Sequence, residues 1–275
     1  MCFLKTLELW KIILHEAKVA FEKEPILSRL YQKSILTHNK FSSSLSYILS
    51  RKLSNSLISK NNIQNIFNKI YSSDFFILNL ITQDLQAILK KDPATKNYLT
   101  PFLYFKGFHA LASYRVSHYL WNKKQYELSM YLQSRISTVF SVDIHPAACI
   151  GSGVFLDHAT GIVIGEGVII EDDVSILHSV TLGGTGKNNN KNRHPVIRSK
   201  VSIGAGAKIL GNIEIGSQSK IGAGSVVLKN VPPCVTVVGV PSKIVNKSNN
   251  THNFCKKNHK KFAHCIEQFY CGDGI

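Results

Sequence analysis

The sequence predicts an α+β protein: an all-helical N-terminal domain, a parallel β-helix with an extruded loop, and a flexible C-terminal tail. Apolar residues recur at helical spacing up to about residue 140 and then at intervals of six. The last thirty residues are polar and basic and show no period. We therefore expect a helical domain over 1–140, a β-helix over 141–245 and a tail over 246–275.

Three apolar stripes indicate helices that pack through one face. The first stripe stops before Pro25, and the second stops before Asp92. Pro93 disfavours helical backbone at Asp92, so we expect Asp92 to lie in a turn. The stripes are Trp10, Ile13, Leu14, Ala17 and Phe21; Leu78, Ile81, Leu85, Ile88 and Leu89; and Phe105, Ala112, Val116 and Leu120.

The second region repeats every six residues. Small residues follow many of the aliphatic ones, as in IGSGV, IGAGA and IGAGS, and glycine permits tight corners. Such hexads are typical of a parallel β-helix, whose coils stack at about 4.8 Å. The aliphatic positions are Ile144, Ile150 and Leu156; Ile164, Ile170, Ile176 and Leu182; and Ile197, Ile203, Ile209, Ile215, Ile221 and Val227.

Two interruptions of the repeat indicate a functional site. In LDHATGIVI the spacing is eight rather than six, which adds two residues just after Asp157 and His158. Over 182–197 it is fifteen, nine more than six, so the loop GKNNNKNRH leaves the coil and carries Arg193 and His194. Solenoids place insertions on one face, often the binding face, so we expect a site near these four residues.

Composition bounds the class of partner. The chain has 33 Lys+Arg against 17 Asp+Glu, a formal net charge of +16 that would suit an anionic partner. The lysines are scattered through Asn- and Ile-rich stretches without a nucleic-acid motif, so we expect no nucleic-acid partner.

The start of the sequence does not predict a targeting signal. Charged residues interrupt the apolar run at its start, so we expect neither a signal peptide nor a membrane span. Six cysteines without a CxxC spacing favour free thiols and a cytoplasmic location.

Two other kinds of site were weighed. The segment GGTGK lacks the first glycine and the final Ser/Thr of a phosphate-binding loop. Three histidines can hold zinc on a β-helix, and His145, His158, His178 and His194 lie in or beside the coils. They show no paired metal-ligand spacing, which argues against a zinc site. Because the histidines nevertheless lie near the coils, a zinc hydratase stays an alternative.

Several motifs resemble the serine acetyltransferase family of the bacterial cysteine pathway. They are DIHPAACIGSGVFLDHATGIVIGEG, SVTLGGTGK, RHPVIRSKVSIGAGAKILGNIEIG and GAGSVVLKNVPP, with DPATKNYLTPFLYFKGFHALASYRVSHYLW in the helical region and GDGI at the end. The resemblance implies a left-handed β-helix. It also implies transfer of the acetyl group of acetyl-CoA to the hydroxyl of L-serine, which gives O-acetyl-L-serine and CoA in the first step of cysteine biosynthesis.

The resemblance also implies roles for single residues. Serine needs a base because its hydroxyl is a poor nucleophile until its proton is withdrawn, and it is a zwitterion that needs partners for both charges. The matching positions are His158 as the base, Asp143 as the carboxylate that orients its imidazole, Asp92 and Asp157 for the amino group, and Arg193 and His194 for the carboxylate.

For acetyl-CoA the resemblance implies a groove between neighbouring β-helices, with no metal. The matching positions are Gly184, Thr185, Ala205 and Ala223, where small residues admit the pantetheine arm, and Lys220 near the phosphates. A covalent route through a Cys149 thiolate is the alternative, but no neighbour in sequence would lower its pKa. We therefore favour direct transfer by general-base catalysis.

The resemblance finally implies an assembly and partners. The family forms trimers with active sites between subunits, and its helical domains join two trimers into a homohexamer. The terminal Ile275 matches the residue that docks into O-acetylserine sulfhydrylase, and L-cysteine is a possible feedback inhibitor. A third function follows from this tail: an inactive subunit that regulates the sulfhydrylase, against which the intact Asp143, Asp157, His158, Arg193 and His194 argue.

Overall fold

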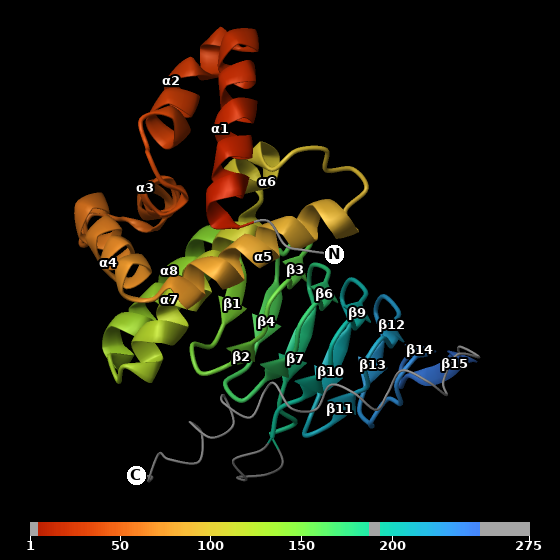
Figure 1. Cartoon of the computed structure of the whole chain (residues 1–275). Helices are drawn as coiled ribbons and strands as arrows, with labels where there is room; N and C mark the ends of the chain where they lie inside the picture. The colour runs from red at the N-terminus through yellow and green to blue at the C-terminus, as the bar shows by residue number, and fades with distance from the viewer. Residues whose placement is uncertain (1–4, 187–192, 248–275) are drawn as a thin grey trace.

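The computed structural model describes residues 5–186 and 193–247, and its helices all precede its strands (Figure 1). The helices pack together at one end of a solenoid whose coils run away from them toward β15 (Figure 1). The predicted docking residue Ile275 lies outside the described residues.

Eight α-helices form the N-terminal part of the described chain, and the three predicted stripes are confirmed as α1, α5 and α7. The buried side chains of α1 and α5 include Trp10, Ile13, Ile81 and Leu85. The helices are α1 (Thr6–Lys23), α2 (Ser28–Tyr31), α3 (Phe41–Leu53), α4 (Lys60–Ser73), α5 (Phe75–Lys91), α6 (Leu99–Tyr104), α7 (Lys106–Asn122) and α8 (Tyr126–Phe140), with short η1 (Pro25–Leu27) and η2 (Gln32–Leu36) turns.

Helix α5 matters most for the site, and its ends follow from the sequence. The Asp74 carboxylate accepts a hydrogen bond from the Phe76 amide at 2.9 Å and so caps the first turn. The helix ends at Lys91, and Asp92 is extended, with φ −100° and ψ 107°. This confirms the predicted stop before Pro93.

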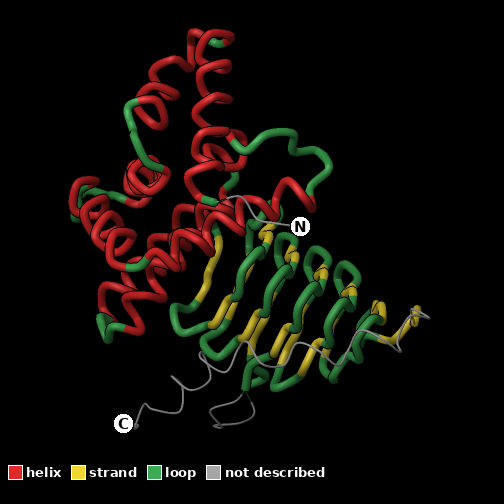
Figure 2. The backbone as a smooth tube through the Cα atoms, viewed as in Figure 1, coloured by secondary structure: helices red, strands yellow, loops and turns green. Residues whose placement is uncertain are grey.

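The second part is a left-handed parallel β-helix with three sheets (Figure 2). Sheet A has the order β1-β4-β7-β10-β13, sheet B β11-β8-β5-β2, and sheet C β15-β14-β12-β9-β6-β3. The strands are β1 (Val142–Ile144), β2 (Cys149–Ile150), β3 (Phe155–Leu156), β4 (Ile162–Ile164), β5 (Ile169–Ile170), β6 (Ser175–Ile176), β7 (Thr181–Gly183), β8 (Val196–Ile197), β9 (Ser202–Ile203), β10 (Lys208–Leu210), β11 (Glu214–Ile215), β12 (Lys220–Ile221), β13 (Val226–Val227), β14 (Val235–Val238) and β15 (Lys243–Lys247).

The hexad positions stack inside the solenoid. Ile150 pairs with Ile170, which pairs with Ile197, and all three side chains are buried. A chain that turns through sheets A, B and C in each coil therefore places one aliphatic residue of every hexad in the core. We call the turn from sheet C to sheet A the CA corner and the turn from sheet A to sheet B the AB corner.

The strand register locates both insertions. Leu156 pairs with Ile176 and Ile164 pairs with Leu182, so the eight-residue step of the first coil spans the same CA corner that takes six residues in the next coil. The longer loop leaves at an AB corner, between β7 and β8. Both insertions therefore border sheet A, at opposite edges.

A buried ion pair joins the helices to the first coil. Arg115 of α7 donates from Nε to Asp84 Oδ2 of α5 at 2.7 Å and from Nη2 to the Gly151 carbonyl at 2.6 Å. Asp84 Oδ1 also accepts the Val154 amide at 3.1 Å. Since both side chains are buried and bond both to each other and to the backbone of the coil, the pair fixes α5 and α7 against the coil that leads to β3.

No helix within the two described segments is both long enough and apolar enough to cross a membrane.

Candidate functional site

The CA corner after β3 carries Asp157 and His158 on strained backbone. His158 and Ala159 both have positive φ, 55° and 60°, a conformation that costs about 1–2 kcal/mol for each residue with a Cβ. The corner is held by hydrogen bonds from the Thr160 amide to the His158 carbonyl at 2.8 Å and from the Gly161 amide to the Ser141 carbonyl at 2.7 Å. Strain of this kind persists only where neighbours enforce it, which is common at functional sites.

Helix α7 packs directly beneath this corner. A Cβ on Gly107 would lie 2.1 Å from the Leu156 carbonyl oxygen and 3.1 Å from the Ala159 Cβ. Lys106 also donates from Nζ to the Thr160 hydroxyl. The missing side chain at Gly107 therefore lets the helix backbone support the turn that presents His158.

The two adjacent polar side chains of the corner point into solvent to different degrees. The His158 side chain is 73% exposed and the Asp157 side chain 30%, with His158 Nε2 3.8 Å from Asp157 Oδ1. This distance is too long for a hydrogen bond, so the imidazole remains available to a substrate. The His178 ring, at the same corner of the next coil, lies edge-on at a centroid distance of 5.9 Å.

Asp92 reaches the same corner from the end of α5. Its carboxylate accepts the Thr95 hydroxyl at 2.5 Å and the Ala94 amide at 2.9 Å. These bonds, led by the Thr95 hydroxyl, lower the pKa of Asp92, and the positive form of His158 lowers it further. An ionised Asp92 near His158 is suited to an ammonium group.

The AB corner after β7 carries the second polar group. The His194 ring lies over a turn with two glycines: a Cβ on Gly165 would be 2.7 Å from the ring, and one on Gly167 would be 3.1 Å away. The Gly167 amide donates to His194 Nδ1 at 3.3 Å, so the neutral ring carries its proton on Nε2. Burial, followed by the charge of Arg193, lowers the pKa of His194. Arg193 itself is exposed.

Asp143 lies on β1 and does not contact His158 within the described chain. Its Oδ1 accepts the Gln133 side-chain amide at 2.7 Å. Its charge raises the pKa of His145, an effect that opposes the dominant lowering by burial. One chain therefore groups Asp143 with the AB corner and leaves His158 at the other edge of sheet A.

The predicted acetyl-CoA positions continue these two edges. Ala205 and Ala223 occupy the CA corners of later coils, where a Cβ on Gly204 would lie 2.5 Å from the Ala223 amide nitrogen. Thr185, just past β7, lies beside the AB corner together with Gly184, and Lys220 opens β12. Four of the five predicted positions at these edges are thus glycine, alanine or threonine.

The four histidines weighed as zinc ligands divide between the corners. His158 lies with His178, whereas His145 lies with His194. In the part of the chain that is described, no group of three or more His, Cys, Asp or Glu side chains could hold a metal ion. Cys149 is buried on β2.

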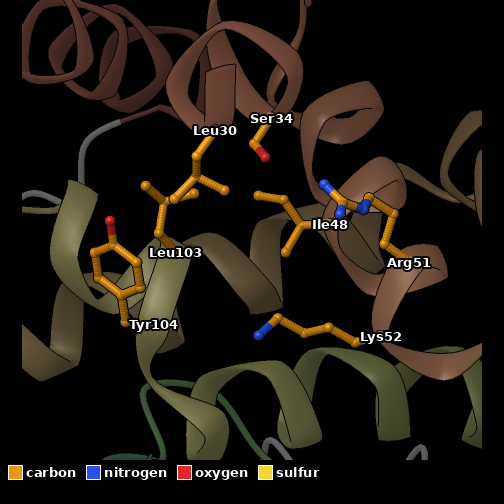
Figure 3. Close-up of a pocket in the computed structure, with 7 residues that line it drawn as sticks. All are labelled: Leu30, Ser34, Ile48, Arg51, Lys52, Leu103 and Tyr104. Carbon is orange, nitrogen blue, oxygen red and sulfur yellow. The ribbon is translucent and has the colours of Figure 1, made fainter. Parts of the chain in front are cut away.

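A cavity of about 260 Å³ lies between side chains of the helical part (Figure 3). Leu30, Ser34, Ile48, Arg51, Lys52, Leu103 and Tyr104 line it. It contains none of the residues that the sequence predicts for the site.

The sequence did not predict the roles of several residues near the site. Gln133 on α8 holds Asp143, and Gly107 on α7 supports the CA corner. Glu166 opposes the lowering of the His145 and His194 pKa values. A helical glycine within an otherwise apolar segment was the available signal for Gly107, while nothing in the local pattern distinguishes Gln133.

The arrangement offers an exposed imidazole beside two carboxylates at one edge of sheet A, and a guanidinium with a second imidazole at the other edge. Such a set can take a proton from a hydroxyl and bind both charged groups of an amino acid.

Comparison with known proteins gives two family models and close relatives. The model "Serine acetyltransferase, N-terminal" matches residues 9–113, and the model "Bacterial transferase hexapeptide (six repeats)" matches residues 194–229. The serine acetyltransferase of Buchnera aphidicola subsp. Schizaphis graminum is 67% identical over 95% of this chain and 100% of its own. That of Haemophilus influenzae is 51% identical over 88% of this chain and 90% of its own.

Solved structures agree with these relatives. A serine acetyltransferase in complex with CoA has a TM-score of 0.85 and 51% identity, covering 88% of this chain and 100% of that one. One in complex with cysteine has a TM-score of 0.86 and 50% identity over the same shares. Soybean serine acetyltransferase complexed with serine has a TM-score of 0.85 and 46% identity, covering 87% of this chain and 98% of that one.

Proposed function

We propose that this chain, which belongs to the serine acetyltransferase family, transfers the acetyl group of acetyl-CoA to the hydroxyl of L-serine. The products are O-acetyl-L-serine and CoA, in the first step of cysteine biosynthesis. The observation that carries this proposal is the exposed His158 imidazole, beside Asp157 and Asp92 on a strained corner.

His158 acts as the general base. Its neutral imidazole accepts the hydroxyl proton of serine as the hydroxyl oxygen attacks the thioester carbonyl carbon. The tetrahedral intermediate then collapses, the carbon–sulfur bond breaks, and the CoA sulfur takes the proton back from the imidazolium. An imidazole suits both steps because its ordinary pKa, about 6.5, lies close to neutral pH. The mechanism uses neither a metal nor a cysteine nucleophile.

The remaining residues bind the two charged groups of serine. Asp92 and Asp157 bind the ammonium group next to the base. Arg193 and His194 bind the carboxylate, since a guanidinium can donate two parallel hydrogen bonds and His194 has an Nε2–H donor. Each end of the substrate thus meets the opposite charge.

Because these two groups occupy opposite edges of sheet A in one chain, we place the complete site between two copies. The CA corner of one copy faces the AB corner of its neighbour. In that arrangement Asp143, grouped with the AB corner, orients the His158 imidazole of the other copy and stabilises its positive form. Three such heterologous contacts close a trimer.

The same juxtaposition forms the acetyl-CoA groove. Ala205 and Ala223 of one CA edge, with Lys220 at the phosphates, oppose Gly184 and Thr185 of a neighbouring AB edge. The absence of large side chains admits the pantetheine arm to both backbones.

We assign residues 1–140 to an oligomerisation domain, 141–245 to the catalytic domain and 246–275 to a tail. Exposed apolar side chains of the helical part, among them Phe75 and Phe76, support the pairing of two trimers into a hexamer. The cysteine pattern supports a cytoplasmic location.

Two regulatory partners complete the proposal. L-Cysteine inhibits by occupying the serine site, which the complex of a similar serine acetyltransferase with cysteine supports. The tail binds O-acetylserine sulfhydrylase through Ile275, as its GDGI ending suggests.

The test is thiol release from acetyl-CoA by the purified protein with L-serine, L-homoserine or no acceptor. We expect release with L-serine, with O-acetyl-L-serine identified by mass spectrometry, and loss of it in His158→Ala. Release without serine, or an acetylated Cys149 during turnover, would contradict the mechanism.

A further inference from the structure

Lys91, the last residue of α5, spans the junction between the helices and the solenoid. Its Nζ donates to the carbonyl oxygens of Gly153 at 2.9 Å, Asp173 at 2.7 Å and Val174 at 3.3 Å. These carbonyls belong to the same corner of two successive coils. An ammonium group has three donors, so all three are used here.

This contact fixes the substrate-facing ends of two elements relative to each other. Asp92 follows Lys91 directly, and its carboxylate is already oriented by Thr95 and Ala94. On the other side, Gly153 lies four residues before Asp157 on the chain that forms β3. The Lys91 bonds therefore bridge the Asp92 turn to the strand that presents Asp157 and His158.

Another fixed point of α5 lies further back. Asp84 is two helical turns before Lys91 and holds the Val154 amide at 3.1 Å. Lys91 is bonded to the solenoid and directly precedes Asp92, so its three bonds hold the helix end at the residue next to the carboxylate. Loss of these bonds would let the end of α5 shift, and the adjacent Asp92 carboxylate would shift with it.

The electrostatics of Lys91 agree with a charged anchor. Burial lowers its pKa to about 8, with the repulsion of Lys90 adding to this, while the carboxylates of Asp173 and Asp84 oppose it. Near pH 7 the amine is still protonated, so it keeps all three hydrogen bonds.

We propose that Lys91 is a positioning residue that holds the Asp92 carboxylate at the corner of Asp157 and His158 and thereby sets the affinity for the acceptor's ammonium group. The inference rests on the proposed function for its substrate and on the contacts above for its geometry. Lys91 touches no reacting atom.

The experiment compares Lys91→Met with Lys96→Met in the full-length protein. Lys96 is the matched control because its Nζ also donates to a carbonyl, that of Pro93 at 2.6 Å, but makes no described bond to the solenoid. For Lys91→Met we expect the KM for L-serine to rise about ten- to a hundredfold, since misplacement by about 1 Å costs this much. The KM for acetyl-CoA should change less than twofold, and Lys96→Met should match the wild type.

A double-mutant cycle with Asp92→Asn separates positioning from a general structural effect. If Lys91 acts through Asp92, Lys91→Met should change the serine KM little in the Asp92→Asn background. Equal effects in both backgrounds, or an unchanged serine KM in Lys91→Met, would overturn the proposal.

Amide hydrogen exchange of residues 92–99 gives a readout that needs no activity. Faster exchange in Lys91→Met than in Lys96→Met supports the anchor, and equal exchange overturns it. A wild-type protein that fails to acetylate serine would instead overturn the proposed function, so the two failures are distinguishable.

Discussion

Replacing Gly107 by alanine tests the support of the catalytic corner by α7. In most helix interiors, Gly→Ala stabilises a protein by about 1 kcal/mol because alanine is the better helix former. Here the added Cβ would lie 2.1 Å from the Leu156 carbonyl oxygen, whereas carbon and oxygen atoms normally approach to about 3.3 Å. Helix and corner must therefore separate by about 1 Å.

The gain in helix propensity and the cost of overpacking change the free energy of unfolding in opposite directions, and the short distance at Gly107 makes the cost the larger of the two. Overpacking against backbone costs about 3 kcal/mol, so Gly107→Ala should lower the free energy of unfolding by about 2 kcal/mol after the gain in helix propensity. The same displacement of His158 should lower kcat by about a hundredfold. Urea denaturation and steady-state kinetics measure both. Gly183→Ala is a steric control for folding, because its Cβ would meet no atom closer than 3.6 Å. A Gly107→Ala protein that is more stable than the wild type and fully active would refute this reasoning.

Three further predictions follow from the described contacts. Burial lowers the pKa of His109 to about 3, so as the pH falls below about 6.5 the unfolded protein binds a proton at His109 before the folded protein does. Between pH 7 and pH 5, urea denaturation should therefore show a loss of unfolding free energy that is about 2 kcal/mol smaller in His109→Gln than in the wild type. Asp84→Asn should lower the free energy of unfolding by about 3–5 kcal/mol in the same assay, because Arg115 is left buried without its counter-charge. A loss below about 1 kcal/mol would mean that the pair is not buried in solution. Gly165→Ala pushes against the His194 ring and should raise the KM for L-serine about tenfold in steady-state kinetics, while an unchanged KM would remove His194 from the serine site.

The fold could be predicted because its signals are local. Hexads of aliphatic residues specify coils, and the register of Ile150, Ile170 and Ile197 follows directly from their spacing. The end of α5 was predictable for the same kind of reason, since Pro93 restricts the residue before it. The insertion lengths also located both corners.

The candidate site was less accessible because it depends on contacts far apart in sequence. The sequence pattern drew Asp157, His158, Arg193 and His194 together, yet the two pairs occupy opposite edges of sheet A. The hexad repeat predicts the coils of one chain, but it does not predict which edge of sheet A contacts a neighbouring copy. The bonds of Lys91 to carbonyls more than sixty residues away likewise leave no local signature.

The central claim, that one site combines the CA corner of one copy with the AB corner of another, has a direct test. Chains with His158→Ala and chains with Arg193→Ala, each inactive alone, are coexpressed with different tags, and mixed oligomers are purified through both tags. In a mixed trimer one interface joins an intact His158 to an intact Arg193, so activity should return to about a third of the wild-type value. Mixed oligomers no more active than the single variants would contradict the account.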